Sequence, residues 1–455
     1  MSSSKTMIND LTGGSVARTL IKFAYPFALS NTLQVVYNLV DIIIIGRFVG
    51  SSGLAATAMG GEIMMLLTMC CVGMSNSGQV MISQYIGLGR RDELRSVIGT
   101  MFTCILSVSI LLSVIGLLFT DTFVTWVRVP EEAFKQAVDY VIVCFCGTFF
   151  IYGYNIVSAI LRGMGDSRRP FIFIAVAACV NLVLDIFFVI VLHMDTRGAA
   201  LATVIGQAVS FIVSIIYLYR RREAFGFDFR PASFVPSMRH LRPMLRLGAP
   251  MAIQNAAISI SFLFINSLIN VYGVTVAAVT GVGMKLMQVM SIFGNAVGTA
   301  GSTMIGQNFG AGKLDRCRRI VHVALICCLC ACVVLTLIYN LFPHAVFGLF
   351  SDDPEVLAFA PQYMLIIAFY FLSFAFMSPY TALINGIGFA GLSLIIALLD
   401  GVVSRIGLSL LFGKALNMGY FGIWLGSSLA GFSTALVAML YFYSGSWKKR
   451  SLLVK

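Results

Sequence analysis

Acidic residues lie inside long apolar stretches of the sequence, where an ionised side chain is unfavourable; they are Asp41, Glu62, Asp185 and Asp400. A carboxylate at the centre of a lipid bilayer costs about 3 kcal/mol on insertion scales, so such a residue usually has a function. Carboxylate, amide and hydroxyl oxygens suit a small hard cation such as Na⁺, and neighbouring carboxylates can equally share a proton. Reversible binding of a cation or a proton is the chemistry that these residues indicate.

Further polar residues accompany the acids. Within 20–46, four side chains recur at three- and four-residue steps and so share one helix face: Gln34, Tyr37, Asn38 and Asp41. That face must line a cavity or a polar packing interface rather than lipid. Asn181 precedes Asp185 by one helical turn, Thr203 begins the next apolar stretch, and Asn155 stands close to two tyrosines. These groups could complete a cation site, or could form a structural hydrogen-bond cluster.

The composition places the acids in a membrane protein. Of the 455 residues, 59% are hydrophobic and 11% charged, whereas soluble domains have about 25% charged residues. The net charge of +12 lies mostly in short connections between apolar stretches, which is typical of membrane topology and not of a nucleic-acid-binding surface. Residues 1–18 contain no apolar core of a cleavable signal peptide. The cysteine-rich run 327–332 lacks histidine and acidic neighbours, so we expect buried thiols there and no metal site.

Twelve apolar stretches are long enough to cross a bilayer as helices. We predict an all-α fold with spans at 19–45, 54–80, 95–119, 135–160, 170–192, 197–220, 246–271, 276–305, 318–342, 357–384, 389–413 and 420–444. Basic residues concentrate in alternate connections, most densely at Arg220, Arg221 and Arg222. By the positive-inside rule this pattern predicts a multi-pass protein of the cell membrane with both termini in the cytoplasm.

The two halves of the sequence repeat each other. SQYIGLGRRDELR at 83–95 corresponds to GQNFGAGKLDRCR at 306–318, an offset of 223 in the numbering, and Pro26 corresponds to Pro250 at an offset of 224. Each half holds six spans, so both halves insert in the same orientation, as two lobes related by a pseudo-twofold axis along the membrane normal, with substrate expected between them. The predicted domains are a cytoplasmic tail (1–18), an amino-terminal lobe (19–222), a cytoplasmic linker (223–243), a carboxy-terminal lobe (244–446) and a basic tail (447–455).

These features together resemble the multidrug and toxin extrusion (MATE) family. The resemblance rests on the twelve spans in two repeats, the proline in spans one and seven, and the paired Gln-x-x-Gly-x-Gly loops after spans two and eight, and it covers about 15–446. It implies a secondary antiporter, not an enzyme, that exports organic and often cationic, amphipathic compounds in exchange for Na⁺ or H⁺. It also implies small-molecule substrates, no cofactor beyond the coupling ion, and a monomer in the bilayer.

The site residues most resemble those of the DinF-like subgroup. In that subgroup the amino-terminal lobe binds the cation through residues that match Asp41, Asn181, Asp185 and Thr203, which makes this set a possible Na⁺ site. The resemblance makes Tyr37 and Asn155 neighbours of the site, and we group Gln34 and Asn38 with them as further polar or substrate contacts. The NorM-like subgroup uses acids in spans seven and ten instead. Here span seven has Gln254 and Asn255, and span ten has no acid.

Two other charged pairs need an interpretation. Glu62 and Lys285 occupy equivalent positions at the offset of 223, so we predict a pair that forms a gate between the lobes when the outer side closes; separate solvation of each charge is the alternative. Asp400, Ser404 and Arg405 lie within one span and are expected to form a structural polar group.

Two other functions compete with the antiporter. A lipid-linked oligosaccharide flippase of the same superfamily would need many basic residues in its cleft, but only Lys285 and Arg405 lie well inside the spans. A membrane-embedded transferase would need paired acidic metal-binding motifs, and the acids of the inner connections are dispersed. The sequence therefore favours an antiporter coupled through Asp41 and Asp185.

Overall fold

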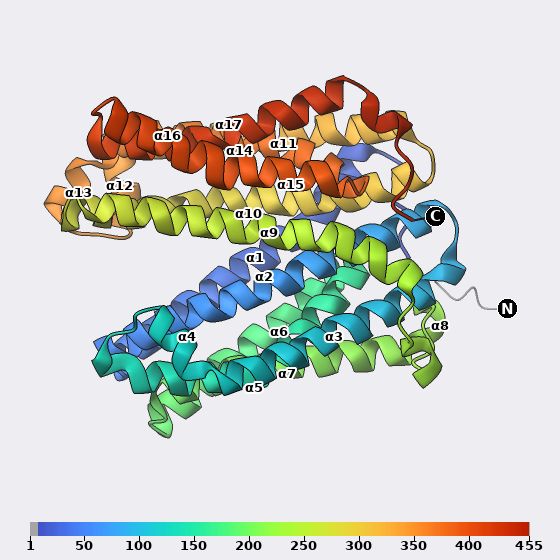
Figure 1. Cartoon of the computed structure of the whole chain (residues 1–455), viewed down its shortest axis with the longest axis horizontal. Coiled ribbons are helices and arrows are strands. Elements are labelled where there is room, and N and C mark those ends of the chain that lie inside the picture. Colours follow the sequence, from blue (N-terminus) through green and yellow to red (C-terminus); the bar gives the residue numbers. More distant parts are fainter. Residues whose placement is uncertain (1–7, 455) are drawn as a thin grey trace. The chain divides into compact units, whose positions relative to one another are not determined.

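The computed structural model describes residues 8–454, and every regular element in that range is helical. Twelve helices are long and apolar enough to cross a membrane, which confirms the predicted fold class. Ten of the spans are formed mainly by α1 (Val16–Phe48), α2 (Ser51–Gly87), α3 (Leu94–Leu118), α5 (Glu131–Gly163), α7 (Asp195–Arg220), α9 (Met238–Asn270), α10 (Val274–Gly310), α11 (Leu314–Leu341), α14 (Ala360–Gly386) and α17 (Gly419–Tyr443) (Figure 1). The other two are composite: 168–191 begins with α6 (Arg168–Asp185), and 390–415 begins with α15 (Ala390–Leu398). Residues 1–7 and Lys455, parts of the predicted tails, lie outside the described residues.

Short elements connect or extend these helices. Both composite spans contain π-helix: α6 continues through η2 (Ile186–Val191), and α15 is followed by η4 (Leu399–Ile406). The remaining elements are η1 (Arg91–Glu93), α4 (Thr120–Trp126), α8 (Arg222–Phe225), η3 (Pro231–Phe234), α12 (Pro343–Gly348), α13 (Pro354–Ala358), α16 (Gly407–Leu410), η5 (Leu411–Ala415) and η6 (Ser446–Lys449).

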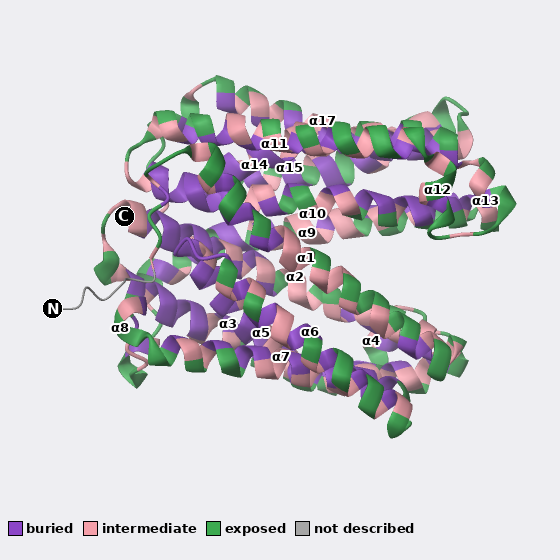
Figure 2. Cartoon of the chain, turned by 180° about the vertical axis from the view of Figure 1, so that it is seen from behind, coloured by how far each residue is buried: buried purple, intermediate pink, exposed green. Residues whose placement is uncertain are grey.

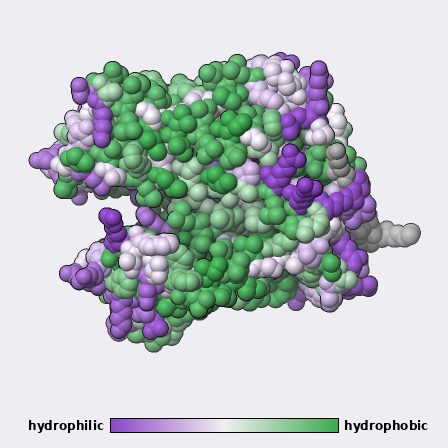
Figure 3. All heavy atoms as spheres, viewed as in Figure 1, coloured by the Kyte–Doolittle hydropathy of each residue, from purple (hydrophilic) through white to green (hydrophobic). Residues whose placement is uncertain are grey.

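The surfaces of the helices suit a lipid environment. Large hydrophobic side chains of the long helices, such as Leu118, Val183 and Leu365, are exposed. Exposed residues recur along the whole length of the helices (Figure 2). Hydrophobic residues cover the middle of the helices, and hydrophilic residues gather towards the helix ends (Figure 3). A soluble protein rarely exposes apolar surface of this extent, so the helices are membrane spans.

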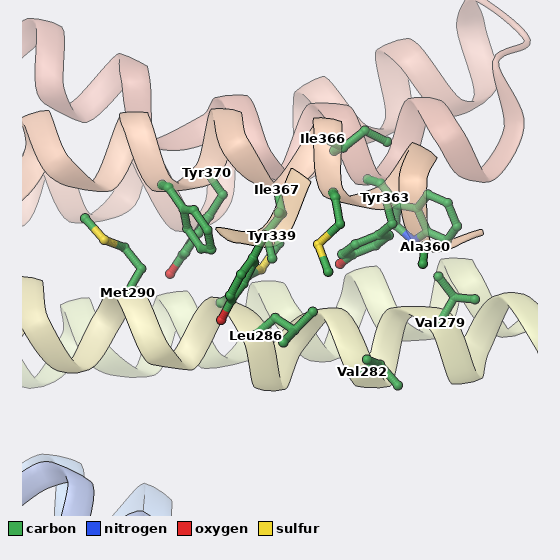
Figure 4. Close-up of a cluster of buried hydrophobic side chains, with 14 of the residues drawn as sticks. Val279, Val282, Leu286, Met290, Tyr339, Ala360, Tyr363, Ile366, Ile367 and Tyr370 are labelled. Carbon is green, nitrogen blue, oxygen red and sulfur yellow. The ribbon is translucent and has the colours of Figure 1, made fainter. Parts of the chain in front are cut away.

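The chain divides into two compact units, one of residues 25–252 and one of residues 11–24 and 253–453. In the first unit α5 packs against α2, α3 and α7, and in the second α14 packs against α10, α11 and α17. Because α5 and α14 end at Gly163 and Gly386, which correspond in the repeat, the same helix of the repeat is central in each unit. Apolar side chains of α10 and α14, among them Leu286 and Ile367, form much of the core of the second unit (Figure 4).

Close helix contacts repeat in both units. A Cβ atom added to Gly163 would lie 2.8 Å from the carbonyl oxygen of Gln79, and one added to Gly386 would lie 2.7 Å from that of Ser302. The two glycines, and likewise Gln79 and Ser302, correspond at the offset of 223. Glycine is needed at such positions because the helix backbones approach too closely for a side chain. The internal repeat is therefore present in the packing of each unit.

The repeated Gln-x-x-Gly-x-Gly motif is largely helical, which corrects the expectation of a loop. The helices α2 and α10 continue to Gly87 and Gly310, so Gln84 and Gln307 lie in the last turns and are buried. The Gln307 carboxamide oxygen accepts a hydrogen bond from the backbone N–H of Leu11 at 2.9 Å. At Gln307 the motif thus supplies a buried acceptor to the segment that precedes α1.

The segment between α7 and α9 packs against α3 of the first unit. The carboxylate of Asp228 forms an ion pair with Arg95 at 2.9 Å, and the backbone N–H of Ser237 donates to the Thr100 hydroxyl at 3.1 Å. The hydroxyl of Ser233 donates to Asp228, which lowers the pKa of that carboxyl group. The segment predicted as a linker is thus held against α3 by these contacts. The linker boundaries of 223 and 243 stay a prediction.

Candidate functional site

Three helices of the first unit bring the four predicted cation-binding residues together. Asp41 comes from α1, Asn181 and Asp185 from α6, and Thr203 from α7. The carboxyl group of Asp41 lies close to that of Asp185, and Asn181 also lies close to Asp185. The Asn181 amide nitrogen donates to the Thr203 hydroxyl at 3.4 Å. Residues far apart in the sequence therefore form one polar cluster.

Oxygen atoms of this cluster are buried and unsatisfied. Asp185 is fully buried and Asn181 is 4% exposed. Within residues 8–454, no hydrogen-bond partner exists for Asp41 Oδ1, for either oxygen of Asp185, or for Asn181 Oδ1. Leaving a buried acceptor unpaired costs about 1–3 kcal/mol, and two neighbouring carboxylates also repel each other. The donor set fits a small monovalent cation or a shared proton, either of which would relieve both penalties.

The local helix geometry positions the donors on α6. Asn181 and Asp185 are four residues apart, so their side chains lie on one face. Directly after Asp185 the helix changes to π-geometry, in which the backbone N–H of Leu192 donates to the carbonyl oxygen of Phe187 at 3.0 Å. Such π-helical turns occur frequently at functional sites. The acid thus stands at a break in the regular helix.

Tyrosines border the acids. Tyr37 of α1 and Tyr140 of α5 lie within electrostatic range of Asp41, and Tyr154 lies near Tyr37. The Tyr154 hydroxyl donates to the carbonyl oxygen of Pro170 at 3.2 Å, which ties α5 to α6. Tyr140 was missed in the sequence, because a single tyrosine in an apolar helix has no distinguishing spacing. The repeat could have indicated Tyr140: it corresponds to Tyr363, and each tyrosine ring packs against a glycine, Gly60 or Gly283, of the corresponding helix.

The other predicted neighbours are placed less closely. The Asn155 amide nitrogen donates to the carbonyl oxygen of Ile151 at 2.8 Å, within its own helix. Gln34 is half-buried and Asn38 is exposed. Glu62 and Lys285 are both exposed and belong to different units, so the gate between them stays a prediction.

The predicted structural pair on the eleventh span is confirmed. Arg405 Nη2 lies 3.0 Å from Asp400 Oδ1, and both residues are buried. The hydroxyl of Ser404 instead donates to the Ser433 hydroxyl at 2.7 Å. Asp400, Ser404 and Arg405 all belong to the π-helical segment Leu399–Ile406. In π-geometry a residue hydrogen-bonds five positions along the chain, which stacks Asp400 next to Arg405.

A protein-family model described as MatE matches residues 26–187 and 250–411 of the chain, more than half of its length. The second matched stretch begins and ends at the repeat counterparts of the first. The chain is 28% identical to "Probable multidrug resistance protein YpnP" of Bacillus subtilis (strain 168), over 98% of this chain and 99% of that protein. It is 27% identical to "Probable multidrug resistance protein YoeA" of the same organism, over 96% of each.

The fold matches solved structures as well. A MOP superfamily transporter from Pyrococcus furiosus Vc1 superposes with a TM-score of 0.90, covering 99% of each chain at 21% sequence identity. At 21% identity this match shows that the two chains share a fold.

Proposed function

The chain belongs to the MatE family, and from this premise we propose that it is a secondary antiporter that exports small organic compounds in exchange for Na⁺ or H⁺. The membership makes it a multi-pass membrane transporter and not an enzyme. The names of its Bacillus relatives, probable multidrug resistance proteins, support organic and often cationic, amphipathic compounds as substrates.

One observation carries the coupling mechanism: the pair Asp41–Asp185 with its buried, unpartnered oxygens. In the proposed cycle, a Na⁺ ion or a proton from outside binds between the two carboxyl groups. Binding removes their mutual repulsion and draws α1 towards α6, which expels substrate held beside α1. Release of the ion to the cytoplasm restores the repulsion and reopens the substrate site.

The sequence of α1 suits this movement. Pro26 lies inside the helix, where it removes a backbone hydrogen bond and weakens the helix against bending. The Ser30 hydroxyl donates to the Pro26 carbonyl oxygen at 2.8 Å, and a serine that bonds back to the carbonyl four residues earlier favours bending of a helix. A helix weakened at Pro26 can transmit the state of Asp41 to its own amino-terminal half.

The remaining parts of the proposal concern the arrangement in the membrane. We infer that both termini lie in the cytoplasm, since the basic connections alternate with poorly charged ones. We also propose that the protein acts as a monomer. No cofactor is required beyond the coupling ion. Asn181 and Thr203 orient the ion-binding carboxyl of Asp185, and Tyr37 borders the same site.

Transport in reconstituted vesicles tests the proposal. Efflux of a fluorescent organic cation is measured with a Na⁺ gradient alone, with a pH gradient alone, and with neither. We expect one gradient to drive efflux by the wild-type protein, and Asp41→Asn and Asp185→Asn to abolish it. Asp121→Asn, at an exposed acid outside the site, should transport normally. Gradient-driven efflux by folded Asp41→Asn protein would refute the mechanism.

A further inference from the structure

The repeat assigns each residue of the cation cluster a counterpart in the second unit. Near α7 and α17 equivalent backbone contacts set the register: the N–H of Met194 donates to the carbonyl oxygen of Phe188 at 3.0 Å, and that of Met418 to the carbonyl oxygen of Phe412 at 3.1 Å. A Cβ added to Gly198 or to Gly422 would likewise meet the carbonyl carbon of Phe188 or Phe412, at 3.1 and 2.5 Å. Each of these pairs corresponds at the offset of 224, so the two units are aligned here by identical contacts.

At this register Arg405 takes the place of Asn181, and Ser427 takes the place of Thr203. Ile265 stands in the place of Asp41 and Ser409 in the place of Asp185, so neither carboxylate has an acidic counterpart. The side-chain contacts agree with the alignment. Arg405 Nη1 lies 3.4 Å from the Ser427 hydroxyl and 3.2 Å from the Ser427 carbonyl oxygen, just as the Asn181 amide lies 3.4 Å from the Thr203 hydroxyl. The second unit thus preserves the interhelical contact of the cation cluster but uses a guanidinium group.

A small cavity lies at the equivalent place in the second unit. Its volume is about 20 Å³, and its lining includes Ile265, Tyr363 and Ser427, the counterparts of Asp41, Tyr140 and Thr203. The remaining wall is mostly apolar and aromatic, with Phe262 and Trp424. Figure 4 shows Tyr363 on α14 directed towards α10. A cavity therefore persists at this place, although the positions of both carboxylates hold uncharged residues, Ile265 and Ser409.

A positive charge stands beside this cavity, because Arg405 contacts two of the residues that line it, Phe262 and Ser427. Arg405 is 3% exposed, its guanidinium carbon lies 4.4 Å from the centre of the Phe262 ring, and Asp400 neutralises it at 3.0 Å. An arginine stays protonated in proteins, and stacking on an aromatic ring stabilises it further. Unlike a bound ion, it cannot leave the site.

We propose that Arg405 is an internal cation that permanently fills the second unit's copy of the cation site. The chain would then couple through a single exchangeable site, the one at Asp41 and Asp185, and Asp400 would be a latent cation ligand that Arg405 blocks. The inference rests on the proposed function for the identity of the first site. It adds a residue that limits the number of coupling ions and a second, latent site for a monovalent cation.

Ion binding by the purified protein tests this inference. Binding of radioactive Na⁺ at fixed pH, and proton uptake in Na⁺-free buffer, are measured per mole of protein in detergent. We expect one ion for the wild type and none for Asp41→Asn. Adding Arg405→Gln to Asp41→Asn should restore one ion, because the buried Asp400 carboxylate then needs a partner. Adding Asp400→Asn as well should remove that ion again.

Two variants control for folding and for charge. Arg405→Lys keeps the internal charge and should bind one ion, as the wild type does. If Arg405→Gln does not fold, Asp400→Asn with Arg405→Met removes both charges of the pair and should fold and bind one ion. The inference is overturned if folded Arg405→Gln binds no additional ion, or if the neutral pair binds two. Persistent binding by Asp41→Asn would instead refute the proposed function. The effect of Arg405→Gln could still be measured as the difference in bound ions between Asp41→Asn with and without that second substitution.

Discussion

Cation-dependent stability of the purified protein gives a quantitative test of the Asp41–Asp185 site. An ion that binds only the folded protein stabilises it by about 2.7 kcal/mol at a concentration of 100 times its Kd. For a chain of 455 residues, extrapolation from smaller domains gives a rise in Tm of roughly 3 °C. The four unpartnered buried oxygens of the site are the reason to expect this stabilisation.

Replacing Asp41 with asparagine removes one of the two negative charges that would attract the bound cation. At a separation of about 4 Å and an effective dielectric constant near 20, that charge contributes about 4 kcal/mol. Since each 1.4 kcal/mol changes Kd about tenfold, the affinity falls roughly a thousandfold. At the same ion concentration the variant is then far below saturation, and its Tm rise should be well under about 1 °C.

The assay is thermal unfolding in detergent, with titrations of Na⁺ at fixed pH against a choline control, and of pH in the absence of Na⁺. Asp185→Asn should lose the stabilisation as Asp41→Asn does. Asp121→Asn, with its exposed carboxylate, should keep the wild-type response. The reasoning is refuted if folded Asp41→Asn shows the full wild-type rise in Tm.

Two other predictions concern Thr203 and the predicted gate of Glu62 and Lys285. Thr203→Val removes the hydroxyl that accepts the hydrogen bond of Asn181, so we expect roughly tenfold weaker ion affinity in the same titration. Thr203→Ser retains a hydroxyl and should retain the wild-type affinity. Equal affinity of both variants would argue against an orienting role of Thr203. Cysteines at Glu62 and Lys285, in a background without the exposed native cysteines such as Cys70 and Cys146, should cross-link when the outer side is closed; the gate is excluded if no transport condition yields a cross-link.

The fold and the main acids could be read from the sequence for simple physical reasons. Twelve apolar runs of spanning length and an internal repeat of half the chain determine the helices, because the bilayer limits helix length and composition. Asp41 and Asp185 stand out because acids are rare in such runs. Asn181 follows from its one-turn spacing to Asp185.

Other features needed the structure. Tyr140 borders the site through the packing of α5, which spacing alone does not reveal. The match of Arg405 to Asn181 depends on a shift in register. Phe173 and Ile396, which accept equivalent hydrogen bonds from α7 and α17, correspond at the offset of 223, whereas Phe188 and Phe412 correspond at 224. The π-helical segment Leu399–Ile406 lies between and accommodates the additional residue. A side-chain contact was needed to decide which residue replaces the asparagine.

The central claim is that one ion bound between Asp41 and Asp185 is exchanged for substrate. The most direct test measures ion movement driven by substrate: vesicles containing the protein receive an imposed gradient of an organic cation, with no ion gradient, and the uptake of radioactive Na⁺ or protons is followed. The account predicts opposite movement of ion and substrate for the wild type and no substrate-driven ion movement for Asp41→Asn or Asp185→Asn. Substrate-driven ion movement at the wild-type rate in either folded variant would contradict it.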